Sequence, residues 1–152
     1  MRSSLLLLLL IFLSACAEEK TLDQYLAESE AYMEAGDYPA AHIELRNALH
    51  IDPSSAAARY QLGSIHFNTD ANIDAEKELL HAQTYGWPGD EVRPMLAKAL
   101  LKQAKFTEVL ELEVEDLQPV PAGKLLSVQV LAAFFTGDSA IARALFDLAK
   151  EK

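Results

Sequence analysis

The 152-residue sequence has one cysteine, few aromatic residues and few basic residues. A single cysteine allows no internal disulfide and no zinc site built from several thiolates. The 13 lysines and arginines are outnumbered by 23 acidic residues, and the resulting net charge of −10 disfavours binding to nucleic-acid phosphates. Six glycines and six prolines are too few for a collagen-like or proline-rich chain, and a hydrophobic content of 51% excludes a disordered one.

The longest purely apolar run is short and lies at the N-terminus. It spans residues 5–13, which is nine residues, whereas a transmembrane helix needs about 20. Arg2 precedes the run, and the small residues Ser14 and Ala15 follow it. This is the layout of a secretory signal peptide. The sequence therefore predicts a cleaved signal over residues 1–15.

The only cysteine follows this segment directly, in the motif Leu-Ser-Ala-Cys at residues 13–16. The motif resembles the lipobox of bacterial lipoproteins, in which the signal is cut before the cysteine and the cysteine is acylated, for example with palmitate. The resemblance implies lipid attachment at Cys16, a short tether over 16–21, and an envelope location facing the periplasm. Ala17 rather than Asp follows the cysteine, which implies the outer membrane more than the inner. The alternative is an ordinary signal peptide with an incidental cysteine.

The rest of the sequence repeats every 34 residues, with a last step of 33. A residue of small or moderate size recurs at Ala41, Ala75, Val109 and Ala142. A repeat of this length is the mark of stacked supersecondary units. Small side chains are needed where two helices cross closely. The residues expected to pack the units together are Ala41, Ala48, Pro53, Leu62, Gly63, Ala75, Ala82, Ala97, Ala142 and Ala149.

This pattern resembles the tetratricopeptide repeat (TPR), a helix–turn–helix unit of 34 residues that carries Leu-Gly, Ala and Pro at fixed places. Leu62, Gly63 and Pro53 stand at such places here. The resemblance implies an all-α fold: a right-handed superhelical solenoid of about four helix pairs over residues 22–152, after the cleaved signal. The expected units are 22–55, 56–89, 90–122 and 123–152.

Local signals predict the ends of several helices. Thr21 and Gln24 have the spacing of a capping box at the start of the first helix. Gly36 can adopt the left-handed conformation that ends this helix, and Asp37 can cap the next. One of the two serines after Pro53 is expected to cap the third helix.

Other positions depart from the repeat pattern. Ala104 stands where the first and fourth units have glycine, and a left-handed alanine costs about 1–2 kcal/mol, so we expect the third unit to turn differently. Residues 118–123, with two prolines and a glycine, are the best candidate for a linker. Pro94 is expected in the first turn of its helix, where proline is tolerated.

No arrangement of residues predicts catalysis or a bound cofactor. The four histidines, His42, His50, His66 and His81, lack the spacing of a helical metal site, and no phosphate loop or dinucleotide fingerprint occurs. Packing inside the array is the expected role of His66. The acidic residues between 111 and 116 are expected to form a solvated face. The sequence therefore predicts a protein that is not an enzyme.

The TPR resemblance also implies a concave groove, lined by the first helix of each pair, that binds protein partners. Transferring the family's groove positions onto this chain gives Tyr60, Ser64, Phe67, Asn68, Lys98, Lys102, Leu131 and Phe134. The aromatic residues are candidate anchors, and the two lysines are candidates to face an acidic group. The alternative is that each aromatic side chain only closes its own helix pair. Leu26 and Glu30 replace the Lys and Asn that grip a chaperone's C-terminal carboxylate in some TPR domains, which argues against that mode.

Several segments narrow the resemblance further: 41–49, 75–79, 95–101 and 105–110. They are similar to the opening repeats of the TPR lipoproteins found with exosortase (PEP-CTERM) protein sorting and exopolysaccharide export, which are longer arrays. The resemblance implies a scaffold for such a machinery. The alternatives are a pilus or outer-membrane-protein assembly lipoprotein and a regulatory subunit of an envelope polysaccharide enzyme. Either the array is a shortened relative, or another chain covers Phe146 and its neighbours, with self-association through the last helix as one way.

Overall fold

The computed structural model describes residues 19–151, so the predicted signal peptide and the predicted lipidation site at Cys16 lie outside the described residues. The described part folds into helices and connecting turns, with no strand in that range. The helices are α2 (Leu22–Glu34), α3 (Tyr38–Ile51), α4 (Ala56–Asn68), α5 (Asn72–Thr84), α6 (Gly89–Lys102), α7 (Phe106–Leu110), α8 (Pro119–Phe135) and α9 (Ser139–Ala149).

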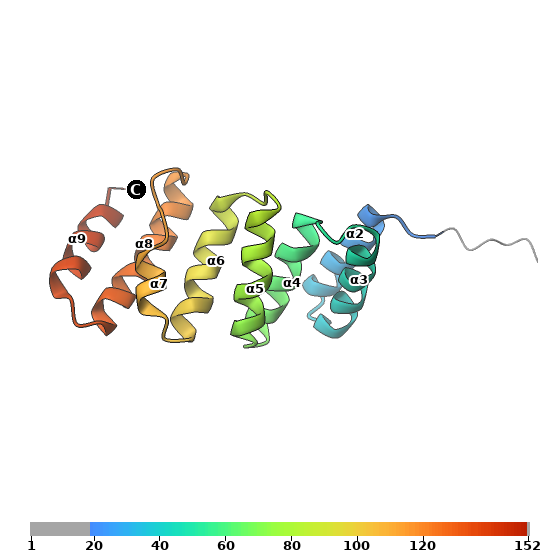
Figure 1. Ribbon diagram of the computed structural model, residues 1–152, viewed down its shortest axis with the longest axis horizontal. Helices are drawn as coiled ribbons and strands as arrows, with labels where there is room; N and C mark the ends of the chain where they lie inside the picture. Colours follow the sequence, from blue (N-terminus) through green and yellow to red (C-terminus); the bar gives the residue numbers. More distant parts are fainter. Residues whose placement is uncertain (1–18, 152) are drawn as a thin grey trace, which may run out of the picture.

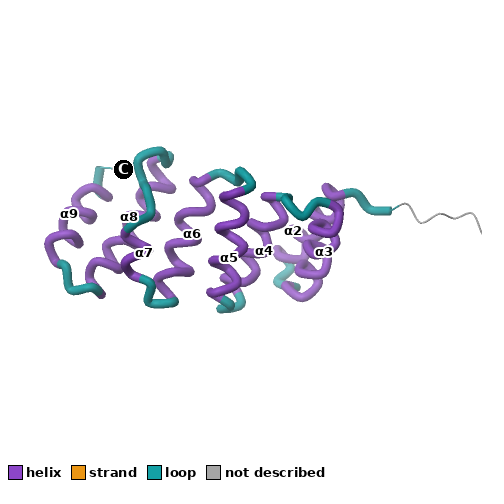
Figure 2. The backbone as a smooth tube through the Cα atoms, in the orientation of Figure 1, coloured by secondary structure: helices purple, strands orange, loops and turns teal. Residues whose placement is uncertain are grey.

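The helices follow one another along a single elongated row, with α2 and α3 at one end and α9 at the other (Figures 1 and 2). We call α2, α4, α6 and α8 the A helices, and α3, α5, α7 and α9 the B helices. Each A helix packs against the B helix that follows it, and each of α3, α5 and α7 also packs against the next A helix. Residues distant in the sequence therefore meet only through neighbouring pairs. None of the helices in the described range has the length and apolar character needed to span a bilayer.

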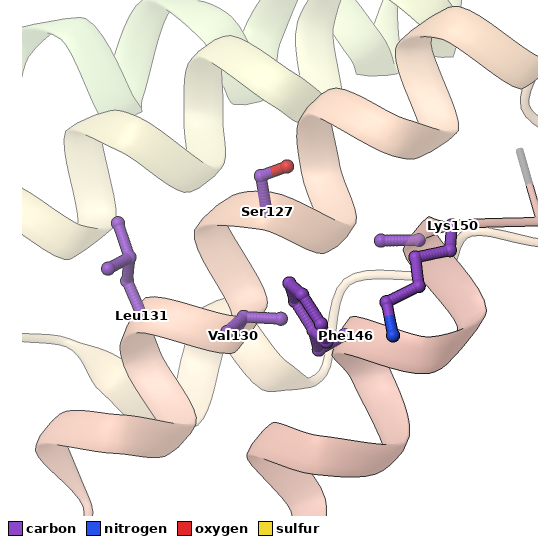
Figure 3. A pocket seen from close by; sticks show the side chains of 6 residues that line it. Ser127, Val130, Leu131, Phe146 and Lys150 are labelled. Carbon is purple, nitrogen blue, oxygen red and sulfur yellow. The ribbon is translucent and has the colours of Figure 1, made fainter.

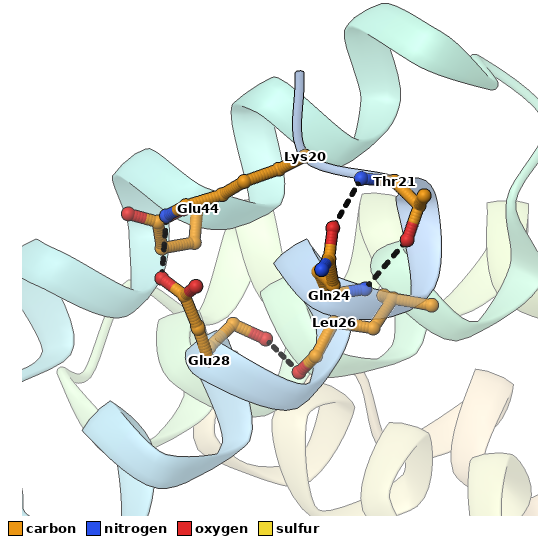
Figure 4. A network of polar contacts seen from close by, with 7 residues as sticks. Lys20, Thr21, Gln24, Leu26, Glu28 and Glu44 are labelled. Carbon is orange, nitrogen blue, oxygen red and sulfur yellow. Dashed lines mark hydrogen bonds and ion pairs between the residues drawn. The ribbon is translucent and has the colours of Figure 1, made fainter. Parts of the chain in front are cut away.

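The predicted helix starts are confirmed. The Thr21 backbone N–H donates to Gln24 Oε1 at 2.8 Å, and the Gln24 N–H donates to Thr21 Oγ1 at 3.3 Å, which completes the capping box (Figure 4). Asp37 caps α3 by accepting from the Ala40 N–H at 3.1 Å. Ser55 caps α4 in the same way. These side chains satisfy backbone donors that have no partner within the helix.

The expectation of a different turn at Ala104 is wrong. All four turns between an A helix and its B helix contain a left-handed residue at the same place. The φ angles are 74° at Gly36, 59° at Asp70, 58° at Ala104 and 81° at Gly137. In the third turn the Lys105 N–H donates to the Leu100 carbonyl at 3.0 Å, and the corresponding bond closes each of the other turns. Packing of the pair therefore outweighs the cost of left-handed alanine.

The third B helix is much shorter than the others, because α7 ends at Leu110 and an irregular segment leads to α8. Continuing the helix would place several acidic residues at its negative C-terminal end. The buried Gln129 of α8 donates to two carbonyls near the point where the helix ends, to Val109 O at 3.1 Å and to Leu112 O at 2.9 Å. The segment is thus fixed in place by side chains of the neighbouring A helices.

Arg93 of α6 holds the other half of this segment. Its guanidinium forms two parallel hydrogen bonds with the Asp116 carboxylate and a third with the Glu113 carbonyl at 2.8 Å. The hydrogen bonds from Arg93, with its charge as a smaller contribution, hold the pKa of Asp116 below its usual range. Part of the acidic cluster that the sequence assigned to a solvated face is therefore anchored to α6.

The positions predicted for two proline-containing segments are also wrong. Residues 118–123 form no linker, because Gln118 is the N-cap of α8 and Pro119 its first residue. Proline is well accommodated there, since the first helical N–H groups have no intrahelical partner. Pro94 lies inside α6, beyond the first turn, because that helix begins at Gly89. Its ring removes one hydrogen bond from the helix interior.

The core runs along the interface between the helix layers in two clusters. One contains Leu45 and Ala48 with Leu62 of α4, and the other contains Leu79 and Ala82 with Leu96 of α6. Of the ten residues expected to pack the units, seven are buried. The other three are Pro53, which is exposed, and Ala142 and Ala149 of α9, which are half-buried.

Candidate functional site

The A helices line a continuous hollowed surface, which we call the A-helix groove. It consists of two adjoining hollows of about 340 Å³ and 290 Å³ that share Tyr60 and Glu91. All four A helices contribute to it. The lining residues are Glu30, Met33, Tyr60, Gln61, Ser64, Phe67, Trp87, Asp90, Glu91, Pro94, Met95, Lys98, Val120, Pro121 and Lys124.

An aromatic pair lies where the two hollows meet. The rings of Tyr60 and Trp87 are stacked, with centroids 5.1 Å apart and planes inclined by 18°. The Trp87 indole N–H donates to Glu91 Oε2 at 3.1 Å, which fixes the orientation of the ring. Burial, and secondly the Glu91 carboxylate, raise the pKa of Tyr60. The groove therefore has a flat apolar wall with a phenol that keeps its proton at neutral pH.

Two lysines line the larger hollow together with the acidic Asp90 and Glu91. Lys98 of α6 and Lys124 of α8 are both exposed and, among the described residues, have no carboxylate within 4.0 Å. Lys102 differs, because its ammonium lies 4.8 Å from the centroid of the Phe67 ring and pairs with Asp70. Lys98 and Lys124 are therefore the cations available to an acidic ligand.

The structure brings half of the eight predicted groove residues together: Tyr60, Ser64, Phe67 and Lys98. Lys102 lies at the edge beside Phe67, and Asn68 is exposed outside the lining. Leu131 lines a separate hollow with α9, and Phe134 is 72% exposed, with its ring edge against Phe135.

The groove lining also contains residues outside the predicted set, among them Glu91, Lys124 and Trp87. Glu91 and Lys124 follow Asp23 by two and three repeat steps, so the repeat itself could have located them. Trp87 lies between two helices, and only the packed structure brings it against Tyr60. The sequence offers no signal for that contact.

Two of the histidines, His42 and His66, pack against each other. His66 lies half-buried on α4 with its ring 5.8 Å from that of His42, edge to face. Burial, together with the positive potential of His66 and Arg46, lowers the pKa of His42. Within residues 19–151 no three acidic, histidine or cysteine side chains are grouped so that they could hold a metal ion.

Comparison with known proteins identifies the repeat and the architecture. Residues 30–70 match the model of the TPR repeat family. A search of the curated proteins found no match. Among solved structures, MamA of AMB-1 superposes with a TM-score of 0.73 at 19% identity, covering 94% of this chain and 79% of MamA. PilF of Pseudomonas aeruginosa superposes with a TM-score of 0.66 at 21% identity, covering 84% of this chain.

These likenesses establish the fold. The chain is an all-α TPR solenoid, as the repeat spacing predicted, and it spans 59% of the length of PilF. TPR arrays mediate contacts between proteins, and the comparisons indicate no catalytic family. At these identities the two structures say nothing further about what this chain binds.

Proposed function

We propose that this chain is a non-enzymatic scaffold, tethered to the bacterial envelope by lipid on Cys16, that holds a partner protein in the A-helix groove. The A-helix groove is the observation that carries the proposal. The stacked Tyr60 and Trp87, the neighbouring Met95, and two lysines without ionic partners in the described range form a surface suited to a peptide or helix that carries apolar side chains and an acidic group at the lysines.

A double substitution of Tyr60→Ala and Lys98→Ala tests the groove. Aromatic anchors at the centre of an interface contribute 2 kcal/mol or more, so we expect capture of the partner from envelope extracts to fall by about 30-fold. Tyr85→Ala with Lys77→Ala is the matched control, because both residues are exposed on or beside the B helix α5. Equal capture by the two variants would contradict use of the groove.

The lipid anchor is tested by Cys16→Ser. Several acyl chains give stable anchoring, since each buried methylene contributes about 0.8 kcal/mol. We expect the variant to lose labelling by a palmitate analogue and to leave the membrane fraction. Ser14→Ala, which keeps a small residue before the cysteine, is expected to retain both. A Cys16→Ser protein that is still labelled would rule out this anchor.

We propose assembly of an exopolysaccharide-export or protein-sorting machinery on the periplasmic side as the setting, with the outer membrane preferred. The support comes from the sequence segments that resemble the exosortase-associated TPR lipoproteins. A pilus-assembly lipoprotein is the second candidate, and the likeness in fold to PilF is compatible with it. Identifying the captured partner by mass spectrometry separates the two, because an export or sorting component favours the first and a pilus component the second.

A further inference from the structure

A hollow between the B helices α5 and α7 and the A helix α6 lies outside the A-helix groove. It has a volume of about 250 Å³ and is lined by four leucines: Leu80 of α5, Leu96 and Leu100 of α6, and Leu112, which follows the early end of α7. We call it the leucine hollow. It shares no lining residue with the A-helix groove.

The apolar surface of the leucine hollow extends out to solvent. Leu96 and Leu100 are buried and form its base, whereas Leu80 is 44% exposed. Ile73, two turns before Leu80 on the same face of α5, is 74% exposed. An apolar hollow that continues into exposed apolar side chains is the form expected of a contact surface.

Three glutamates complete the lining of the leucine hollow: Glu76, Glu108 and Glu111. The Lys105 ammonium lies 2.7 Å from the Glu76 carboxylate and 3.8 Å from that of Glu108. Glu111 is exposed and, among residues 19–151, has no cationic nitrogen within 4.0 Å. Three carboxylates against one ammonium leave a net negative charge, so the complementary ligand is both apolar and cationic.

This combination is particular to one place in the array. One repeat step earlier, the positions of Glu76, Leu80, Leu100 and Glu111 are held by His42, Arg46, His66 and Lys77. The rings of His42 and His66 pack edge to face there, 5.8 Å apart. The acidic and apolar character of the leucine hollow therefore does not follow from the repeat itself.

The hollow between α8 and α9 provides a contrast (Figure 3). Phe146 and Leu131 contribute to its apolar lining, together with one charged residue, Lys150. The Lys150 ammonium pairs with Asp147 at 2.9 Å and lies 4.3 Å from the centroid of the Phe146 ring. Its charge is already engaged, whereas Glu111 in the leucine hollow remains available to a ligand.

The size of the leucine hollow indicates the kind of ligand. Pockets that enclose whole small molecules measure about 300–1,000 Å³, and this hollow, at about 250 Å³, is smaller. It suits an apolar side chain of a protein partner, since such anchors fill small pockets at the centre of an interface. Cationic side chains next to the anchor would then lie near the glutamates.

We propose that the leucine hollow binds a segment of a partner protein that presents a large apolar side chain flanked by arginine or lysine. The apolar side chain packs on the leucines, and the flanking cations face Glu108 and Glu111. The inference rests on the proposed scaffold function but places a second contact on a surface separate from the A-helix groove. A second copy of this chain is a poor occupant, because the net charge of −10 opposes self-association.

Two synthetic peptides test the proposal: acetyl-Gly-Ser-Arg-Leu-Arg-Ser-Gly-amide, and the same peptide with both arginines replaced by glutamate. Each is titrated into the isotope-labelled full chain, and binding is followed by the amide NMR signals. We expect the arginine peptide to shift the signals of Leu80, Glu111 and Leu112 and to bind about tenfold more tightly than the glutamate peptide. No shift at millimolar arginine peptide, or equal binding of the two, would overturn the proposal.

A charge reversal at the hollow has a matched control. Glu111→Lys is expected to weaken binding of the arginine peptide about fivefold, whereas Glu34→Lys is expected to leave it unchanged. Both residues are exposed glutamates at the C-terminal end of a helix, where lysine is favoured by the helix dipole, so both variants should fold. Equal effects of the two substitutions would contradict the proposed contact.

A third variant and the groove variant separate this inference from the proposed function. Leu80→Ala is expected to weaken both peptides, because it removes apolar contact and no charge. Tyr60→Ala with Lys98→Ala is expected to leave the peptide shifts unchanged even where capture through the groove is lost. Shifts confined to Glu91 and its neighbours would assign the peptide to the A-helix groove and overturn the leucine hollow. A dimer that dissociates in Leu80→Ala, detected by sedimentation, would assign the surface to a second copy.

Discussion

Replacing Leu79 by alanine is expected to destabilise the array by about 2–5 kcal/mol, the range found for leucine truncation in a closely packed core. Leu79 is fully buried in α5 and packs between its own pair and α6. The substitution leaves a cavity where two helix pairs meet, and each pair is stabilised by contact with its neighbours. The free energy of unfolding, from urea denaturation followed by circular dichroism, provides the measurement.

The adjacent residue is the control. Leu80 has the same chemistry on the same helix but is 44% exposed. We expect Leu80→Ala to change the free energy of unfolding by no more than about 0.5 kcal/mol. Similar losses for the two variants would mean that the packing between α5 and α6 differs from that described.

Replacing Gly63 by alanine is expected to destabilise the protein by up to about 2 kcal/mol, the overpacking cost less the helix-propensity gain. A methyl group on Gly63 would lie 2.8 Å from Cγ and 2.9 Å from Cδ2 of the buried Leu79. Overpacking of this kind costs about 1–3 kcal/mol, which exceeds the helix-propensity gain of about 1 kcal/mol. Thermal unfolding monitored at 222 nm by circular dichroism would record a lower midpoint.

Gly123 provides the opposite case for the same substitution. It lies inside α8, and a methyl group there meets no heavy atom within 4 Å beyond its own helix backbone and chain neighbours. Gly123→Ala is therefore expected to raise the midpoint, because only the propensity gain remains. A shift of the same sign in both variants would show that close helix crossing does not decide the outcome at Gly63.

The sequence predicted those features that depend on residues close together in the chain. The capping box at Thr21 and the N-cap at Asp37 are local hydrogen bonds, so a few neighbouring residues suffice to identify them. The 34-residue repeat predicted the helix pairs and hence the solenoid, because each unit must cover the apolar face of the one before. Of the eight groove residues that the TPR resemblance implied, four line the groove.

The A-helix groove as a whole could not be read in this way. Trp87 lies in a turn, and nothing near it in the sequence indicates that it stacks on Tyr60, 27 residues earlier. Lys102 pairs with Asp70, whereas Lys98 has no ionic partner in the described range. Which of the two lysines Asp70 reaches is decided only when α4 and α6 pack together. Which side chains line the A-helix groove is therefore determined by how the helices stack.

What the sequence alone determined is the succession of helix pairs and their capping, since these follow from backbone preferences and a periodic apolar pattern. The tertiary structure decided where the chain departs from these local preferences. Ala104 adopts a left-handed turn against its own preference, because the packed pair stabilises the turn by more than the strain costs. It also decided that α7 ends early, since Arg93 and Gln129 supply partners that only neighbouring helices can bring.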